Sequence, residues 1–347
     1  MKFFRRDAPP GATSPAPASG SPLDGVDLLL ADLDGVVYAG PRAIAHAVDA
    51  INLAARSMRV GYITNNASRT AASVADHLSG LGLQVDADDV VTSPQAAVRL
   101  LAEVVPAGST VLVVGGEGLT SVVDAAGFVV TDSADDAAAV IQGFHPSVGW
   151  TQLAEAAYAL HRGIPWIATN TDWTIPQERG IAPGNGTLVS AVHLAVGRLP
   201  VVAGKPEVPI FTEALTRFGG EHALFIGDRL DTDVLGANRA GIPSVLVLTG
   251  IDGAKQVLAA DASSRPTFLL EDLRELHLPY PEIVEETDAD GIRSVTVNTS
   301  VVRMKGNVLR VAAEGERRID LLRAATTIIW NSGLAIYGID VPTSLHE

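Results

Sequence analysis

The chain has 347 residues, of which 47% are hydrophobic and 19% charged, and its formal net charge is −15. This composition is typical of a globular protein long enough for about two domains, and it excludes collagen-like and wholly disordered chains. Because the chain has no cysteine, disulfides, zinc–thiolate sites, iron–sulfur clusters and thiol nucleophiles are excluded, and any metal must bind to oxygen or imidazole. The acidic charge argues against nucleic acid and anionic membranes as partners. With no apolar run near the about 18 residues of a membrane span and no secretory signal, we expect a cytoplasmic protein.

Residues 1–22 contain few large apolar side chains, so we expect a flexible leader there. From residue 26 onwards, strand-length apolar runs alternate with amphipathic helical stretches, which predicts a parallel sheet. The predicted elements are, in chain order, strand 26–31, helix 44–56, strand 60–64, helix 71–81, strands 111–114 and 138–143, helix 153–162, strand 166–169, helices 187–196 and 206–217, strand 223–227, helix 233–240 and strand 245–248.

The last part of the chain, residues 281–347, has a different pattern. It predicts strands at 292–297 and 308–312, a helix at 316–330 and a last strand at 334–339. The helix carries Ile319, Leu322 and Ile329 at helical spacing, so we expect it to dock onto the core or onto a second subunit. A homodimer is therefore possible, and we assign this segment no chemistry.

Two acidic residues follow the first predicted strand directly, in the run Leu28–Gly35. Because side chains alternate along a strand, Asp32 and Asp34 lie on the same side, at the strand end where open α/β sheets bind ligands. A calcium loop starting at Asp32 would need a glutamate where the chain has Ala43, so that interpretation fails. A simple turn remains an alternative, since two acids one residue apart are common.

Further polar groups follow other predicted strands. Together they indicate a catalytic site more specifically than any one of them does alone. The strand at 223–227 is followed by Asp228 and Asp233, and the strand at 60–64 ends in Thr64, Asn65 and Asn66. Lys205 precedes Pro206, which we expect at the start of a helix, so that the lysine extends from the loop before it. Each of these residues alone is more often structural than catalytic.

These motifs together resemble the haloacid dehalogenase-like hydrolases, in particular the group with a large α/β cap that includes nitrophenyl, phosphoglycolate and glycerol phosphate phosphatases. The resemblance rests on Asp32–Val36, Thr64–Asn66, Lys205–Pro206 and Gly227–Asp233, and it covers about residues 26–276. It implies a doubly wound, Rossmann-like α/β core at 23–82 and 201–280, an inserted α/β cap at 83–200 and a small α+β C-terminal extension at 281–347.

The resemblance also implies a role for each core residue. Asp32 would attack phosphorus and form an aspartyl-phosphate, and Asp34 would act as general acid and then as general base. Mg²⁺ would bind Asp32, Asp228 and the backbone carbonyl of Asp34, with Asp233 just outside the metal's own ligands. Lys205 would neutralise charge on the nucleophile and the phosphoryl group.

Phosphoryl oxygens would contact Thr64 and the backbone of Asn65, with Asn66 beside them. In the cap, Asn170 and Asp172 could reach over the cleft, and Asp172 would suit a substrate hydroxyl better than a second anion. The resemblance therefore implies a small phosphorylated metabolite as substrate, with glycerol 3-phosphate favoured over phosphoglycolate and other small esters.

Three points stay open at the level of sequence. The chain could instead be a receiver module that accepts a phosphoryl group on Asp32 and keeps it, although the acid/base Asp34 and the cap argue for turnover. His145 could influence the leaving group or lie in a solvated loop. Arg229 could contact phosphate or pair with a neighbouring acid, and pairing is the default expectation.

Overall fold

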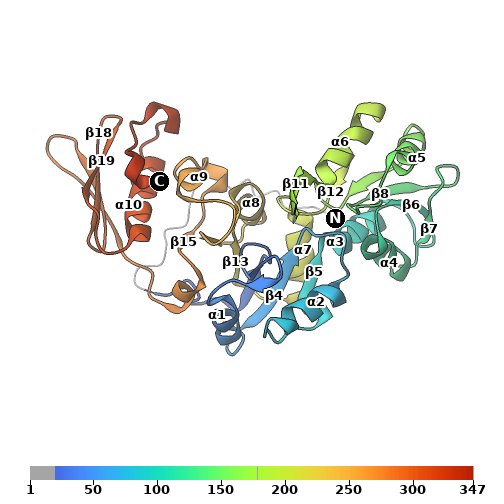
Figure 1. Cartoon of the computed structure of the whole chain (residues 1–347), viewed down its shortest axis with the longest axis horizontal. Helices are drawn as coiled ribbons and strands as arrows, with labels where there is room; N and C mark the ends of the chain where they lie inside the picture. Colours follow the sequence, from blue (N-terminus) through green and yellow to red (C-terminus); the bar gives the residue numbers. More distant parts are fainter. Residues whose placement is uncertain (1–19, 178, 347) are drawn as a thin grey trace, which may run out of the picture.

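The computed structural model describes residues 20–177 and 179–346, which form three sheet-containing parts side by side along the molecule's long axis (Figure 1). The core lies in the middle, the cap at one end and the C-terminal extension at the other. Most of the predicted leader lies outside the described residues. Residues 20–22, the part of it that is described, already contact the core, because the Gly20 carbonyl accepts a hydrogen bond from the Tyr280 N–H at 2.9 Å.

A six-stranded parallel sheet forms the core, in the order β15-β14-β13-β1-β4-β5. Residues of β1 alternate between two hydrophobic clusters, one on each face of the sheet, so helices cover both faces and the doubly wound prediction is confirmed. The strands are β1 Leu28–Ala31, β4 Arg59–Thr64, β5 Val90–Thr92, β13 Ala223–Gly227, β14 Ser244–Val247 and β15 Phe268–Leu270. The helices are α1 Ala47–Ala54, α2 Ala71–Gly80, α7 Val208–Phe218, α8 Leu235–Ala240 and α9 Ala254–Leu258.

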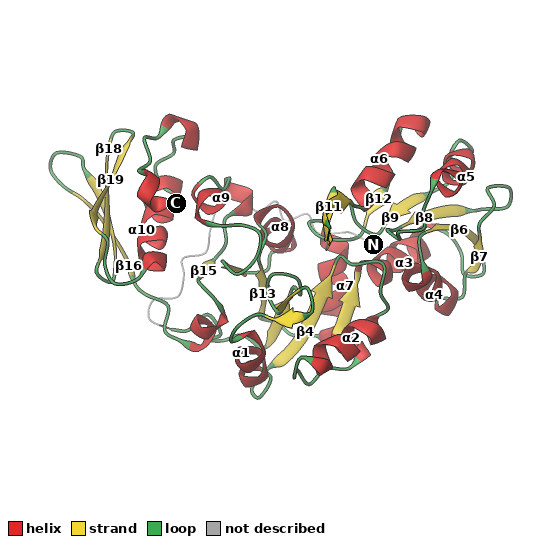
Figure 2. Ribbon diagram, viewed as in Figure 1, coloured by secondary structure: helices red, strands yellow, loops and turns green. Residues whose placement is uncertain are grey.

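The cap contains a second parallel sheet, in the order β12-β9-β8-β6-β7 (Figure 2). Its strands are β6 Thr110–Val114, β7 Val129–Thr131, β8 Ala139–Gln142, β9 Trp166–Ala168 and β12 Val201–Val202, and a hairpin of β10 Thr174–Gln177 and β11 Gly180–Pro183 projects from it. The helices are α3 Ser93–Val104, α4 Glu117–Ala125, α5 Trp150–Leu160 and α6 Asn185–Val196.

The predicted cap range 83–200 differs from the structure at both ends. β5 (Val90–Thr92) pairs with β4 in the core sheet, so the chain enters the cap later than residue 83. β12 (Val201–Val202) pairs with β9 in the cap sheet, so the chain returns to the core later than residue 200. Cap and core also share one hydrophobic cluster, in which Ile63 and Phe225 of the core lie with Ile141 and Ile167 of the cap. The cap is therefore packed onto the core over a continuous apolar interface.

The extension is a four-stranded antiparallel sheet covered on one face by a helix. Its elements are β16 Ile283–Thr287, β17 Arg293–Val297, β18 Ser300–Lys305, β19 Val308–Ala313 and α10 Arg318–Trp330. Leu322 and Ile328 of α10 share a hydrophobic cluster with Val257 of α9 in the core. Docking onto the core, one of the two expected alternatives, is thus what the structure shows.

The predicted last strand at 334–339 is wrong, because Ile336–Gly338 form a 3₁₀ turn and only Asp340 makes a single bridge, to Val308. β16 and β18 were not predicted. Within the described residues, none of the helices has both the length and the apolar character needed to cross a membrane.

Candidate active site

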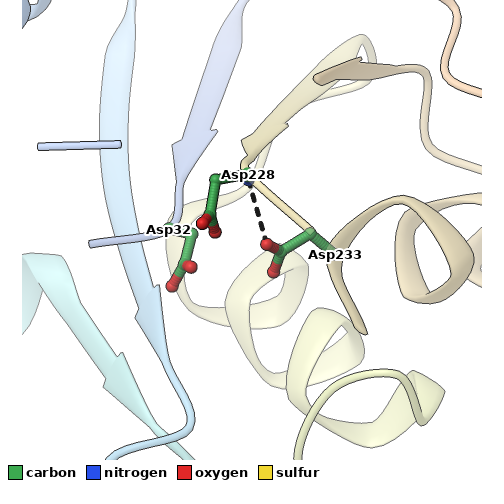
Figure 3. Close-up of side chains that lie close together, drawn as sticks. All are labelled: Asp32, Asp228 and Asp233. Carbon is green, nitrogen blue, oxygen red and sulfur yellow. Dashed lines mark hydrogen bonds between the residues drawn. The ribbon is translucent and has the colours of Figure 1, made fainter. Parts of the chain in front are cut away.

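The candidate site lies at the carboxyl ends of β1 and β13, which are neighbours in the core sheet. Asp32 follows β1, Asp228 follows β13, and Asp233 lies in the π-helical turn Leu230–Val234 (Figure 3). One carboxylate oxygen from each of the three residues lies within 4.8 Å of the others. The structure therefore brings Asp32 together with two acids that lie about two hundred residues later in the sequence.

Asp228 has room because two glycines face it. A Cβ on Gly35 would lie 2.2 Å from Asp228 Oδ2, and a Cβ on Gly250 would lie 1.9 Å from it. Gly35 has φ +79°, a left-handed backbone conformation that glycine adopts without strain. The same Oδ2 accepts a hydrogen bond from the Ile251 N–H at 2.8 Å, so the loop after β14 fixes the position of this carboxylate.

Lys205 lies between two of the acids. Its Nζ is 2.6 Å from Asp32 Oδ1 and 2.7 Å from Asp233 Oδ1, and the lysine is only 3% exposed. The sequence prediction for its setting needs one correction: α7 begins at Val208 with Glu207 as its N-cap, so Pro206 precedes the helix instead of starting it.

Asp233 is buried and ties the site together. Its Oδ2 accepts hydrogen bonds from the N–H groups of Asp228 and Arg229, both at 3.1 Å, while its other oxygen faces Lys205. The Asp233 carboxylate therefore holds both the backbone of Asp228 and the ammonium group of Lys205 in position.

Burial and mutual repulsion change the titration of these acids. Burial, followed by the charge of Asp233, raises the pKa of Asp32 well above its ordinary value and raises the pKa of Asp228 to about 7. Burial alone would lower the pKa of Lys205, but Asp233 and Asp32 outweigh it and the pKa is raised. Three carboxylates around one ammonium leave an excess of negative charge, and an all-oxygen donor set of this kind fits Mg²⁺.

Asp34 keeps solvent contact at the mouth of the site. Partial desolvation nevertheless raises the pKa of its carboxyl, while the charges of Lys205 and Arg69 and a hydrogen bond from the Tyr38 hydroxyl act in the opposite direction. A carboxyl group whose environment favours the protonated form is suited to give up a proton during a reaction.

The predicted phosphate-binding residues follow β4. Thr64 is 3% exposed and its Oγ1 accepts the Asn66 N–H at 3.1 Å. The Asn66 side-chain oxygen accepts hydrogen bonds from the N–H and hydroxyl of Ser68 at 2.9 and 2.7 Å. Contact of Asn66 with a substrate therefore stays a prediction, since its side-chain oxygen is already used within its own loop.

The cap contributes two of the predicted residues. Asp172 lies beside Asn65, whose Nδ2 donates to the Asp172 carboxylate at 3.1 Å, and burial raises the pKa of Asp172. Asn170 is 4% exposed, donates to the Asn65 carbonyl at 2.7 Å and accepts the Asp172 N–H at 3.2 Å. Substrate contact of Asn170 also stays a prediction.

The structure shows the contacts of Arg229 and His145, whose roles the sequence left open. Arg229 donates to Asp231 from Nε at 3.0 Å and from an amino group at 2.8 Å, so pairing with a neighbouring acid is confirmed. The His145 ring nitrogen Nδ1 lies 2.6 Å from the Ser147 hydroxyl, in a loop of the cap that faces Gly116.

Sequence reasoning missed several members of the site. Tyr38 forms a backbone bridge with Asp34, Thr249 donates its hydroxyl to the Gly35 carbonyl at 2.7 Å, and Ser93 donates to the Asn65 carbonyl at 2.8 Å. Tyr38 follows the DLDG motif closely, so its spacing could have drawn attention. The other two lie far away in sequence with no local pattern.

Comparison with known families supports the geometry. Residues 29–129 match the family described as haloacid dehalogenase-like hydrolase, and residues 202–276 match a second model described as HAD-hydrolase-like. Among curated proteins, a D-glycerol 3-phosphate phosphatase of Mycobacterium tuberculosis is 47% identical over 252 residues, which are 72% of this chain and 71% of that protein. An acid sugar phosphatase of Staphylococcus saprophyticus is 34% identical over 250 residues, 71% of this chain and 95% of that protein.

Solved structures give the same result. A glycerol phosphate phosphatase from Mycobacterium tuberculosis in complex with magnesium superposes with a TM-score of 0.82 and 38% identity, covering 91% of this chain and 94% of that one. A p-nitrophenyl phosphatase from Archaeoglobus fulgidus superposes with a TM-score of 0.68 and 29% sequence identity, and the match covers 72% of this chain and 98% of that one. The fold is that of a capped phosphohydrolase. The chain belongs to the haloacid dehalogenase-like hydrolase family and is a phosphatase.

Proposed function

We propose that this phosphatase hydrolyses a small phosphomonoester, with glycerol 3-phosphate as the best candidate, and that it uses Mg²⁺. The observation that carries the proposal is the cluster in which Asp32 lies beside Asp228 and within 2.6 Å of Lys205 Nζ. The 47% identity to a protein named D-glycerol 3-phosphate phosphatase supports this substrate. Membership in a phosphatase family also removes the support for a receiver module.

The first half-reaction transfers the phosphoryl group to the protein. A carboxylate oxygen of Asp32 forms a bond to phosphorus while the bond from phosphorus to the ester oxygen breaks. Asp34 gives its proton to the leaving alkoxide, so the alcohol departs neutral and Asp34 becomes anionic. The raised pKa of Asp34 makes its carboxyl easier to protonate than that of a free aspartate.

The second half-reaction restores the enzyme. Asp34, now a base, takes a proton from a water molecule, whose oxygen attacks phosphorus and displaces the Asp32 carboxylate. Inorganic phosphate leaves and Asp34 is protonated again. Both carboxyl groups return to their first state, so the cycle is balanced without a further reactant.

The metal would be held by Asp32, Asp228 and the Asp34 backbone carbonyl, and it would supply positive charge that lets an anionic nucleophile approach a phosphate dianion. Lys205 adds charge of the same sign, and Asp233 keeps Lys205 and Asp228 in place. Thr64 and the Asn65 backbone N–H would hold the phosphoryl oxygens.

The substrate preference rests on Asp172. This carboxylate lies beside the predicted phosphate-binding loop, where it can accept hydrogen bonds from the hydroxyls of a glycerol moiety. The carboxylate of phosphoglycolate would meet a like charge there. We therefore expect turnover of glycerol 3-phosphate to exceed turnover of phosphoglycolate.

The test is magnesium-dependent phosphate release from glycerol 3-phosphate, phosphoglycolate and sugar phosphates. We expect glycerol 3-phosphate to give the highest kcat/KM, chelation to abolish activity, and Asp32→Asn to lower kcat by several orders of magnitude with an unchanged melting temperature. Full activity in the presence of chelator would overturn the metal assignment, and substantial activity of Asp32→Asn would overturn the nucleophile.

Two further assignments belong to the proposal. We place the protein in the cytoplasm, since its 347 residues contain no cysteine and its expected substrate is a small metabolite. A homodimer stays a prediction, which sedimentation velocity at several protein concentrations tests directly.

A further inference from the structure

Three segments of the chain meet at the side-chain amide of Asn65: the loop after β4, the loop after β9 in the cap, and the linker that returns from the cap to the core. The amide contacts both polar backbone groups of Lys205. Its Oδ1 accepts the Lys205 N–H at 2.8 Å, and its Nδ2 donates to the Lys205 carbonyl at 3.0 Å. One side chain thus fixes the peptide groups on both sides of the lysine's Cα.

The same amide also reaches the cap. Nδ2 donates to the two carboxylate oxygens of Asp172 at 3.1 and 3.3 Å, and the Asn65 carbonyl accepts from Asn170 at 2.7 Å and from Ser93 at 2.8 Å. The packing at this point is close, since a Cβ on Gly204 would lie 2.6 Å from Asn65 Oδ1. The Asn65 amide therefore has little freedom to move independently of Lys205.

We propose that the Asn65 side chain is a positioning residue that holds the Lys205 backbone in register with the nucleophile and joins it to Asp172 in the cap. The ammonium group must stay 2.6 Å from Asp32 and 2.7 Å from Asp233 at the end of a long, flexible side chain. A small displacement of the backbone moves that charge away from the reacting phosphoryl group, and misplacement by about 1 Å can lower a rate about 100-fold.

The side chain and the backbone of Asn65 then have different roles: the side-chain amide holds the Lys205 backbone, whereas we expect the backbone N–H to contact phosphate. Asp172 also has a second task, because its carboxylate orients the amide that holds Lys205. The inference rests on the proposed role of Lys205 in catalysis, but it is independent of whether glycerol 3-phosphate is the substrate.

The test compares Asn65→Asp and Asn65→Ser with wild type, using p-nitrophenyl phosphate and glycerol 3-phosphate. Both variants lose the donor to the Lys205 carbonyl. We expect kcat to fall about 10- to 100-fold on both esters, the range expected when buried hydrogen bonds are lost, with KM within about threefold. Asn65→Ser introduces no charge next to Asp172, so it remains informative if Asn65→Asp folds poorly.

A swapped double variant, Asn65→Asp/Asp172→Asn, separates the two contacts of the amide. It restores a donor–acceptor pair between positions 65 and 172 but not the donor to the Lys205 carbonyl. We expect kcat to stay low. Recovery of wild-type kcat in the double variant would show that only the cap contact matters and would overturn the proposal.

Asn238→Asp is the matched control, because Asn238 also donates its amide to two backbone carbonyls, those of Ser263 and Arg265 at 2.9 and 3.0 Å, outside the catalytic loops. We expect its kcat to equal that of wild type. A loss below threefold in both folded Asn65 variants would overturn the inference alone, whereas a wild-type protein inactive on every ester would overturn the proposed function.

Discussion

Gly250 is the residue at which the loop after β14 comes closest to Asp228. A methyl group there would lie 1.9 Å from the carboxylate oxygen, a distance at which one of the two must move. We expect Gly250→Ala to displace Asp228 and to weaken Mg²⁺ binding about 10- to 100-fold, since overpacking of a close contact costs about 1–3 kcal/mol. Calorimetric titration of the protein with Mg²⁺ measures this directly.

Gly253→Ala is the control for this prediction, since Gly253 lies in the same loop but its added methyl group would meet nothing nearer than Gln256 Oε1 at 3.8 Å. We expect its Mg²⁺ affinity to match that of wild type. Equal affinities for all three proteins would contradict the view that the loop after β14 positions Asp228.

Individual residues of the site differ in how well the sequence reveals them. Asp32, Asp34 and Asp228 could be predicted because each follows an apolar run and so must lie at a strand end. Ile251, which holds Asp228 through its backbone N–H, could not be predicted, because a backbone donor carries no side-chain signature. Its role arises only when β14 lies beside β13.

At the scale of elements, Asp27 joins the starts of two neighbouring strands. Its carboxylate precedes β1 and accepts the N–H groups of Glu221 at 2.9 Å and His222 at 3.0 Å, just before β13. These two backbone hydrogen bonds lower the pKa of Asp27 below its ordinary value. The folded state therefore prefers the ionised form.

A lowered carboxyl pKa stabilises the folded protein above the pKa of the unfolded chain, and this stabilisation is lost as the pH falls through the folded-state pKa. We expect Asp27→Asn to be less stable than wild type at pH 7, and the difference to shrink as the pH falls below about 4. Urea unfolding midpoints of both proteins between pH 7 and pH 3 measure it. A difference that does not change with pH would contradict this account.

Four of the six core strands were predicted, and the three-residue strands β5 and β15 were missed; in the extension β17 and β19 were predicted, and β16 and β18 were missed. Fully buried parallel strands such as β1 are continuous apolar runs, which are conspicuous in sequence. β16 has the sequence Ile-Val-Glu-Glu-Thr and lies at the edge of its sheet, largely exposed, so it lacks that signal. Conversely, residues 334–339 are apolar enough for a strand, but Ile336–Gly338 form a 3₁₀ turn, and only the following residue, Asp340, forms a bridge to the edge strand β19.

At the scale of the whole molecule, Arg323 connects the extension to the core. This arginine of α10 is 2% exposed, donates to the Leu269 carbonyl of β15 at 2.9 and 2.6 Å, and forms ion pairs with Glu275 at 2.5 Å and Asp320 at 2.7 Å. We expect Arg323→Met to lower the free energy of unfolding by about 3–5 kcal/mol, because the buried carboxylates of Glu275 and Asp320 and the Leu269 carbonyl all lose their shared charged donor. Chemical denaturation measures the loss.

Arg310→Met is the comparison variant. Arg310 pairs with Asp340 at 3.3 Å, and both side chains are more than half exposed, so we expect a change below about 1 kcal/mol. We also expect wild type to unfold core and extension in one transition, since Leu322, Val257 and Leu246 belong to one hydrophobic cluster. A separate early transition of the extension would contradict this.

The apolar interface between cap and core has a consequence for what can reach the catalytic acids. Because Ile141 and Ile167 of the cap share one buried apolar cluster with Phe225 of the core, separating the two parts would cost free energy, and we expect the entrance to keep a nearly constant width during turnover. A phosphoserine in a folded protein or a phosphate within a polymer would need a much wider opening. We therefore expect discrimination by molecular size at the entrance, before any hydroxyl of the substrate is recognised.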